Sequence, residues 1–286
     1  MRLSRLLEES ADRIAGAADS DSARLDAELL VASAIAKPRS FLYAFGETEV
    51  EGVPLHAARD AVARRVSGHP VAYILGEKEF WGLTLSVDER VLIPRPETEL
   101  LVELALSLPL VNDAVVADVG TGSGAIALAL ATEKPWFVVA ADYSMSALSL
   151  AVENRARYAA SALPSGEAGS AAALLRSDWL SAFADNSFDL VVSNPPYIDG
   201  DDANLQRGDV RFEPRRALVS DEQGLRDIRR ISEQAWRCLK PGGHLLLEHG
   251  YQQGEAVADL LLQCGYREVS CHCDLAGLPR VSYGRR

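Results

Sequence analysis

The sequence predicts an α/β protein in which a doubly wound, mainly parallel sheet follows a small helical N-terminal domain. Leucines recur at helical spacing in the first part of the chain, whereas short apolar runs alternate with helical segments from Glu97 onward. A glycine-rich loop leaves one of these apolar runs and enters a helical segment. The 286 residues suffice for one large domain or two smaller ones.

The helical domain is expected to span residues 1–75. The apolar positions that define its first two helices fall on one helical face: Leu3, Leu6, Leu7, Leu25, Leu29, Leu30 and Ile35. Pro38 ends the second helix because proline is unfavourable in a helix interior, and residues 53–66 supply a third helix.

A short linker containing strands is expected between the two domains. Residues 71–75 and 80–87 are predicted to be strands, the second with alternating apolar and polar residues, and together they form a hairpin. We therefore assign the linker to residues 76–96 and the larger domain to residues 97–286.

The larger domain carries the pattern of a parallel sheet. Apolar runs predict strands at residues 115–119, 137–141, 173–176, 189–193 and 244–248. Helical segments are expected at residues 123–132, 144–158 and 224–239, with a further helix that begins near Glu97. Strands that are apolar almost throughout indicate a sheet covered on both faces. Residues 159–173 are rich in Ala, Ser and Gly and predict a surface loop without chemistry.

The composition narrows the classes of partner. Lys and Arg number 29 against 41 Asp and Glu, so the net charge of −12 opposes broad binding to nucleic acid. No apolar stretch approaches the roughly 20 residues of a membrane-spanning helix. Glu8 and Glu9 interrupt what would be the apolar part of a secretory signal. With four cysteines in so long a chain, we expect a cytoplasmic protein with reduced thiols.

The glycine-rich loop is the sharpest signal in the first half of the chain, Asp118-Val-Gly-Thr-Gly-Ser-Gly-Ala125. Glycines let the backbone turn tightly and approach a ligand closely. Asp142 follows Gly122 by 20 residues, at the end of the next predicted strand, where a carboxylate accepts from ribose hydroxyls. These residues alone permit NAD, FAD or S-adenosylmethionine. Asp118 favours the last, because a carboxylate attracts the ammonium group of a methionine moiety and repels a pyrophosphate.

A second motif, Asn194-Pro-Pro-Tyr197, directly follows the predicted strand at residues 189–193. Two prolines stiffen the turn, and Asn194 adds a side-chain carbonyl to their backbone carbonyls. These acceptors, with the aromatic ring of Tyr197, form a clamp for a planar –NH₂ group. The nitrogen of an amide or aromatic amine is a poor nucleophile, so a clamp that orients it and stabilises developing positive charge assists methyl transfer.

Together the loop and the clamp resemble class I, S-adenosylmethionine-dependent amino-methyltransferases. Further motifs make the chain similar to the PrmC (HemK) family: Leu92-Ile-Pro-Arg-Pro-Glu-Thr-Glu99, Asn194-Pro-Pro-Tyr-Ile-Asp199, Arg211-Phe-Glu-Pro214, Leu239-Lys-Pro-Gly-Gly243 and Glu248-His-Gly250. That family methylates the side-chain amide nitrogen (N5) of the glutamine in the Gly-Gly-Gln motif of class I peptide chain release factors. The resemblance covers nearly the whole chain, including Asp26-Ala-Glu-Leu-Leu30 in the helical part.

The resemblance implies roles for individual residues. The cofactor S-adenosylmethionine would contact Gly120, Thr121, Gly122, Ser123, Gly124, Asp142, Asp178, Trp179 and Asn194, with Asp142 on the ribose and Asp178 and Trp179 beside the adenine. The substrate glutamine would be held by Asn194, Pro195, Pro196 and Tyr197, with Asn194 as the catalytic residue. The helical domain would dock the release factor, and the sheet would have seven strands, one of them antiparallel.

Some weaker motifs have two interpretations. Cys264, Cys271, His272 and Cys273 lack a zinc-type Cys-x₂₋₄-Cys pair, so we interpret the cysteines as structural thiols and expect no metal. Arg95 and Glu97 either cap a helix or also shape the mouth of the cofactor site. Residues 211–214 form either a substrate-facing loop or a packed turn.

Other functions are alternatives to the interpretation as a release factor glutamine methyltransferase. A glutamine methyltransferase of a ribosomal protein shares the clamp, and so does a DNA adenine methyltransferase, although the acidic charge opposes the latter. A nicotinamide dehydrogenase or a non-catalytic binding module leaves the Asn-Pro-Pro-Tyr motif without a purpose.

Overall fold

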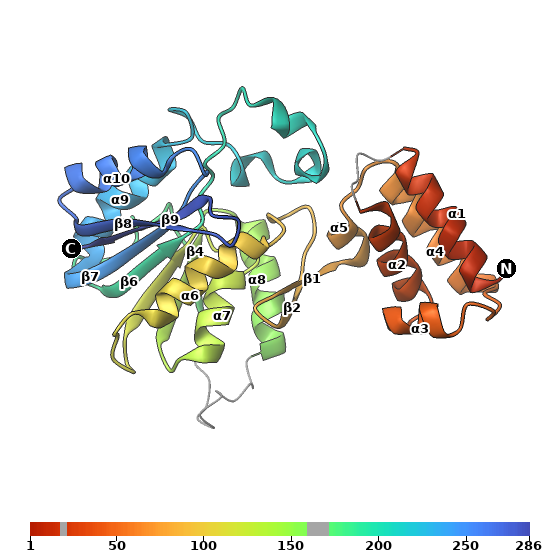
Figure 1. Ribbon diagram of the computed structural model, residues 1–286. Coiled ribbons are helices and arrows are strands. Elements are labelled where there is room, and N and C mark those ends of the chain that lie inside the picture. Colours follow the sequence, from red (N-terminus) through yellow and green to blue (C-terminus); the bar gives the residue numbers. More distant parts are fainter. Residues whose placement is uncertain (18–21, 159–171) are drawn as a thin grey trace. The chain divides into compact units, whose positions relative to one another are not determined.

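The computed structural model describes residues 1–17, 22–158 and 172–286 (Figure 1). They form two compact units. The smaller comprises residues 1–77 and 203–213, and the larger comprises residues 78–202 and 214–286. The surface loop expected at residues 159–173 lies outside the described residues except for its last two positions.

The smaller unit is helical, and the three helices predicted for it are confirmed. Its helices are α1 (Leu3–Ala15), α2 (Ala23–Ala34), α3 (Arg39–Ala44), α4 (Gly52–Val66) and α5 (Val71–Leu75). Leu3, Leu7, Leu30 and Val62 are among the buried side chains of its apolar core. The predicted leucine face of α1 therefore packs in this core. Helix α3 has only about one and a half turns, which is too short for its apolar pattern to predict a helix.

The strand predicted at residues 71–75 is wrong, because these residues form α5. Pro70 precedes the helix, and Gly76 ends it in the left-handed conformation with φ +76° and donates its N–H to the Ala72 carbonyl. Val71, Ile74 and Leu75 pack against the apolar core of the smaller unit. Periodicity does not distinguish a short apolar helix from a strand, and here the packing decides.

A buried arginine joins a distant segment to the helices of the smaller unit. Arg65 on α4 donates to Asp26 on α2 and to Asp209, both at 2.7 Å. Asp209 begins the 3₁₀ helix Asp209–Phe212, and the Phe212 ring lies 4.6 Å from that of His69. Residues 203–213, which follow the Asn-Pro-Pro-Tyr motif along the chain, thus complete the helical unit.

The hairpin between the predicted domains lies at residues 77–86. The strand predicted at residues 80–87 is confirmed only for β2 (Leu83–Ser86), because Trp81 and Gly82 form a turn across which β2 pairs with β1 (Glu77–Phe80). Both turn residues have positive φ, which Gly82 adopts without strain and which matches a two-residue hairpin turn.

The larger unit contains a seven-stranded sheet. The strands are β3 (Val115–Val119), β4 (Phe137–Asp142), β5 (Ala173–Arg176), β6 (Phe188–Ser193), β7 (Leu239–Glu248), β8 (Arg267–Cys273) and β9 (Pro279–Arg285). Their order is β5-β4-β3-β6-β7-β9-β8, and β9 alone runs in the direction opposite to the other six. The sheet expected from the resemblance is therefore confirmed, as are the five strands predicted from apolar runs.

Helices cover both faces of this sheet (Figure 1). They are α6 (Glu99–Ser107), α7 (Ala125–Glu133), α8 (Met145–Tyr158), α9 (Arg226–Cys238) and α10 (Gly254–Gln263). Successive strand residues point to opposite faces: Val116 packs in the cluster that includes α6 and α7, whereas Ala117 packs in the cluster with α9 and α10. The doubly wound α/β fold predicted from the sequence is thus confirmed.

The strand order reverses between β3 and β6. β3 pairs with β4 on one side and with β6 on the other, and the Ser193 hydroxyl donates to the Val119 carbonyl at 2.6 Å. The glycine loop follows β3 and Asn194 follows β6, so both motifs leave neighbouring strands at the same edge. Open α/β sheets bind their ligands at such a switch point.

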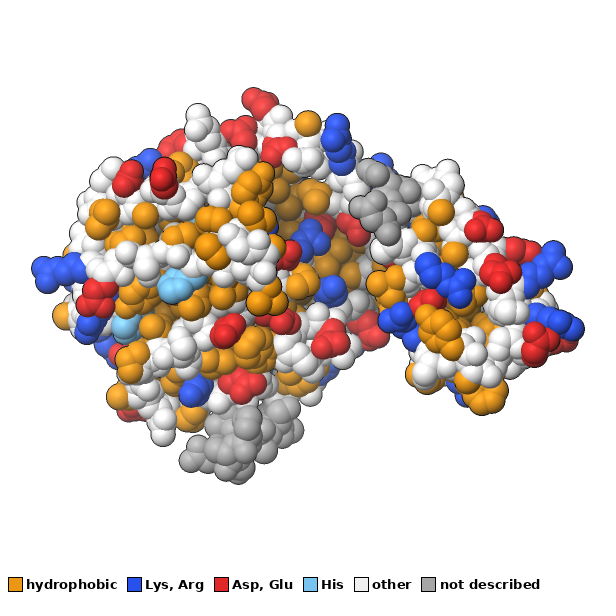
Figure 2. All heavy atoms as spheres, in the orientation of Figure 1, with side chains coloured by type: hydrophobic (Ala, Val, Ile, Leu, Met, Phe, Trp, Pro, Cys, Tyr) orange, Lys and Arg blue, Asp and Glu red, His pale blue; other side chains and the backbone are white. Residues whose placement is uncertain are grey.

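Acidic and basic side chains are interspersed on the face of the larger unit shown in Figure 2. This distribution agrees with the acidic composition and does not concentrate positive charge on that face. Among residues 1–17, 22–158 and 172–286, no helix combines the length and the apolar character that crossing a membrane requires.

Candidate active site

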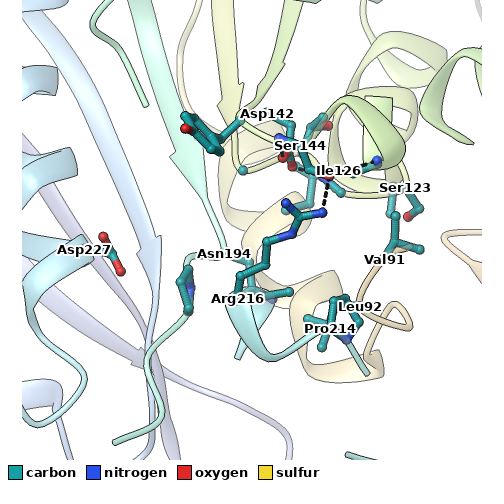
Figure 3. A pocket seen from close by; sticks show the side chains of 18 of the residues that line it. Val91, Leu92, Ser123, Ile126, Asp142, Ser144, Asn194, Pro214, Arg216 and Asp227 are labelled. Atoms are coloured by element: carbon teal, nitrogen blue, oxygen red, sulfur yellow. Dashed lines mark hydrogen bonds between the residues drawn. The ribbon is translucent and has the colours of Figure 1, made fainter. Parts of the chain in front are cut away.

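A cavity of about 440 Å³ lies in the larger unit where the glycine loop and the Asn-Pro-Pro-Tyr motif meet. Its lining includes Arg90, Pro94, Arg95, Thr98, Gly120, Thr121, Gly122, Ser123, Asp142, Asp178, Trp179, Asn194, Pro196, Pro214, Arg216 and Arg230. Figure 3 shows Asp142 and Asn194 on separate elements around this space. The structure therefore brings together most of the residues that the sequence analysis assigned to the cofactor.

The backbone of the glycine loop borders the cavity. Gly120 and Gly122 have φ of +76° and +55°. A Cβ added at Gly120 would lie 3.0 Å from the Trp179 ring, whereas one added at Gly122 would meet no atom within 4 Å and would occupy open space. Gly124 does not line the cavity; it begins α7, and its added Cβ would contact Ala151. Gly122 thus leaves room for a ligand, while Gly124 serves the packing of the helix.

Asp142 stands at the end of β4 with both carboxylate oxygens oriented by the backbone. Oδ2 accepts from the Gly122 N–H at 2.9 Å, and Oδ1 accepts from the Ser144 N–H at 2.7 Å. Burial raises the pKa of Asp142, against the effect of these hydrogen bonds and of Arg216. Arg216 reaches the Ser144 hydroxyl at 2.6 Å (Figure 3). A carboxylate held in this way retains lone pairs for ligand hydroxyls.

Asp178 and Trp179 form another part of the wall. Asp178 accepts from Arg230 at 2.7 Å, so its carboxylate is paired with a cation that also lines the cavity. Trp179 has a φ of +52°, and its ring lies against Gly120. The flat ring beside the loop provides a surface for a planar group.

Asp118 fixes the loop from behind. It is 0% exposed and accepts from the Thr121 hydroxyl at 2.6 Å and from the Ala127 N–H at 3.1 Å. It does not line the cavity, so the structure does not place it as the ammonium partner considered from the sequence. Its carboxylate instead joins β3, the loop and the first turn of α7.

Replacing Asp118 with asparagine is expected to stabilise the protein more at pH 8 than at pH 5. Burial raises the pKa of Asp118 to about 7, so this group contributes stability at low pH that is lost as the pH rises through 7. Between pH 5 and pH 8 the free energy of unfolding falls by about 3 kcal/mol for this reason, and the fall is absent when asparagine replaces Asp118. Urea unfolding of both proteins at the two pH values measures the difference. An equal difference at both would show that Asp118 titrates normally.

Asn194 is one of two residues of the clamp that line the cavity. It follows β6, and its Nδ2 donates to the Thr98 hydroxyl at 3.1 Å. Pro196 also lines the cavity, whereas Pro195 and Tyr197 do not. The Tyr197 hydroxyl donates to Glu248 at 3.3 Å. The structure therefore brings Asn194 and Pro196 to the cavity, and the roles of Pro195 and Tyr197 stay predictions.

The segment before α6 contributes residues that the sequence analysis did not assign to the clamp. Pro96 begins the 3₁₀ helix Pro96–Thr98, as expected of a proline at a first helical position. Arg95 and Thr98 line the cavity, while Glu97 is exposed. The segment therefore borders the cavity, and its effect on cofactor binding stays a prediction.

The structure also shows where residues 211–214 and two of the cysteines lie. Pro214 lines the cavity, whereas Phe212 packs against His69 in the smaller unit. Cys271 and Cys273 are exposed on β8. Within the described parts of the chain, no three His, Cys, Asp or Glu side chains are grouped to hold a metal ion.

Comparison with known proteins gives the family. Family models match residues 5–76 as a PrmC N-terminal domain and residues 96–212 as a methyltransferase small domain. The release factor glutamine methyltransferase of Pseudomonas aeruginosa is 49% identical over 268 residues, which cover 93% of this chain and 94% of the relative. That of Salmonella typhimurium is 47% identical over 268 residues, with coverages of 93% and 94%. The chain belongs to the release factor glutamine methyltransferase family.

Membership in the release factor glutamine methyltransferase family confirms the resemblance found in the sequence. The chain is a methyltransferase. A methyltransferase from Pyrococcus furiosus of known structure matches with a TM-score of 0.54 at 18% identity, over 79% of this chain and 98% of that one, which shows the shared fold.

Proposed function

We propose that this protein transfers a methyl group from S-adenosylmethionine to the side-chain amide nitrogen (N5) of the glutamine in the Gly-Gly-Gln motif of class I peptide chain release factors. The observation that carries the proposal is the placement of Asn194 and Pro196 on the same cavity as Asp142 and Gly122. An acceptor-rich clamp for an amide thus borders a site with the groups that hold a nucleoside.

The lining of the cavity fits S-adenosylmethionine. The open space at Gly122 admits a ligand close to the backbone, and Asp142 offers carboxylate oxygens to the two ribose hydroxyls. Trp179 offers its ring to the adenine. The volume of about 440 Å³ lies within the range of small-molecule sites. When bound, S-adenosylmethionine supplies an electrophilic methyl group on its sulfonium.

Asn194 is the proposed catalytic residue. Its side-chain carbonyl accepts one N–H of the substrate amide, and a backbone carbonyl of the Pro195–Pro196 turn accepts the other. These two hydrogen bonds orient the nitrogen toward the methyl group and strengthen as positive charge develops on it. The methylated nitrogen becomes acidic and then loses a proton, so the chain need not provide a strong base.

The smaller unit is the proposed docking domain for the release factor. Residues 5–76 match the PrmC N-terminal domain. The resemblance in the sequence implied that residues 1–75 dock the release factor. The relatives named above carry this domain and act, by their names, on release factors. A glutamine methyltransferase of a ribosomal protein and a DNA adenine methyltransferase are not favoured, because relatives at 42–49% identity bear the release factor name.

Transfer of a tritiated methyl group tests the proposal. We expect label from S-adenosylmethionine to enter an unmodified class I release factor, and not the same factor with leucine in place of the Gly-Gly-Gln glutamine. The leucine control removes the amide but keeps the body of the factor. Equal labelling of both factors, or labelling of neither, would contradict the proposed substrate.

A further inference from the structure

Asn194 belongs to a group of polar side chains that come from three separate parts of the larger unit. Thr98 belongs to the 3₁₀ helix Pro96–Thr98, Asn194 and Tyr197 follow β6, and Glu248 ends β7. Asn194 Nδ2 donates to Thr98 Oγ1 at 3.1 Å, and the Tyr197 hydroxyl donates to Glu248 Oε1 at 3.3 Å. Thr98 and Glu248 are 4% and 1% exposed, so water does not readily replace these partners.

The direction of the first hydrogen bond decides what Asn194 offers the substrate. An asparagine amide has one donor end and one acceptor end, of nearly equal size. When Nδ2 donates to Thr98, Oδ1 is the end left to accept from an –NH₂ group. A flipped amide would turn its own N–H groups toward the substrate nitrogen, where two sets of donors would face each other.

Glu248 determines whether the Thr98 hydroxyl accepts a hydrogen bond from Asn194 or donates one to it. A hydroxyl carries one proton, and the Thr98 hydroxyl interacts with the buried Glu248 carboxyl group as well as with Asn194. If that proton is donated to the carboxylate, the lone pairs of Thr98 remain for Asn194 Nδ2. Such a chain of hydrogen bonds gives the amide one preferred orientation.

We propose that Thr98, supported by Glu248, is a positioning residue that holds the Asn194 amide with its carbonyl oxygen toward the glutamine nitrogen. This inference rests on the proposed function and adds to it the group that orients the clamp. In this proposed role the Thr98 hydroxyl acts through Asn194 and not by contact with the reacting atoms.

Substitutions at Thr98 separate this role from packing. Valine keeps the shape of threonine and lacks the hydroxyl, whereas serine keeps the hydroxyl and lacks the methyl group. We expect Thr98→Val to lower kcat about 10- to 100-fold, because the amide then adopts both orientations and loses its preorganisation. Thr98→Ser should keep kcat within about threefold of the wild type. Both variants should bind S-adenosylmethionine with nearly unchanged affinity.

The measurements are steady-state methylation of a release factor, calorimetric binding of S-adenosylmethionine and thermal unfolding, with all three proteins. A valine variant as fast as the wild type, or a serine variant as slow as the valine variant, would overturn the inference. Methylation of the release factor by the wild type tests the proposed function by itself. The ratio of kcat between the two variants tests the role of Thr98, so a failure of this inference can be distinguished from a failure of the proposed function.

The pH profile of Glu248→Gln provides a second readout. Glu248 faces Thr98 and Glu97 from the 3₁₀ helix, Tyr197 from the end of β6 and Arg280 from β9. Burial raises its pKa to about 7, and its ionised form is the one that accepts the Thr98 proton. We expect wild-type kcat to rise through pH 7 and the glutamine variant to lack this inflection. An unchanged inflection in the variant would count against the role of Glu248.

Discussion

Replacing Asn194 with alanine is expected to lower kcat for release factor methylation by about 1,000-fold, the magnitude lost when one preorganised group that stabilises developing charge is removed. The side chain of Asn194 borders the cavity and carries the only side-chain carbonyl of the Asn-Pro-Pro-Tyr motif. Alanine leaves the substrate nitrogen without this acceptor and free to rotate. Affinity for S-adenosylmethionine should stay within about threefold, because Asp142 and the glycine loop are untouched.

Single-turnover methylation and calorimetry with S-adenosylmethionine measure the two quantities separately. Asn112→Ala is the matched control, since Asn112 is exposed, lies in the larger unit and is outside the cavity lining, and its kcat should equal that of the wild type. An aspartate variant of Asn194 is less informative, because a carboxylate still accepts hydrogen bonds. If Asn194→Ala kept wild-type turnover, the clamp mechanism would be wrong.

Replacing Asp142 with alanine is expected to weaken S-adenosylmethionine binding by about 100-fold. A hydrogen bond to a charged group contributes about 1.5–3 kcal/mol, and this carboxylate would accept from two ribose hydroxyls. Alanine also removes the acceptor that holds the Gly122 and Ser144 N–H groups, so the loop loses part of its order. At saturating S-adenosylmethionine, kcat should recover toward the wild-type value because Asn194 is intact.

Calorimetry with methylthioadenosine, which keeps the ribose and lacks the amino acid part of the donor, locates the lost contact. The affinities of S-adenosylmethionine and methylthioadenosine should fall by the same factor in Asp142→Ala. Asp142→Asn is the matched control: it preserves the size of the side chain and one acceptor oxygen, and it should fall between alanine and the wild type. A loss seen with S-adenosylmethionine alone would assign Asp142 to the methionine moiety instead.

The sheet and the meeting of its two motifs were predictable because both follow from local patterns. β3 and β6 are apolar almost throughout, which marks strands buried on both faces. Each motif directly follows its strand, and the carboxyl ends of parallel strands lie at one edge. Gly122 and Asp142 could therefore be assigned to one site before the structure, and both line the cavity.

Interactions between distant residues were not predictable in the same way. Thr98 and Asn194 are 96 residues apart, and Arg65 and Asp209 are 144 apart, so no local pattern pairs them. The short run at residues 71–75 was predicted to be a strand because five apolar residues fit either structure, and packing in the smaller unit selects the helix. Asp118 was considered as a partner of the ammonium group, and no local pattern shows that its carboxylate is buried and accepts from the Thr121 hydroxyl.

Identifying the atom that receives the methyl group tests the central claim most directly. A class I release factor incubated with the enzyme and S-adenosylmethionine is digested, and tandem mass spectrometry is applied to the peptide with the Gly-Gly-Gln motif. The account predicts one added methyl group on the glutamine, released as methylamine on acid hydrolysis, because the clamp holds the amide nitrogen. A methyl group on another residue, or one that yields no methylamine, would contradict it.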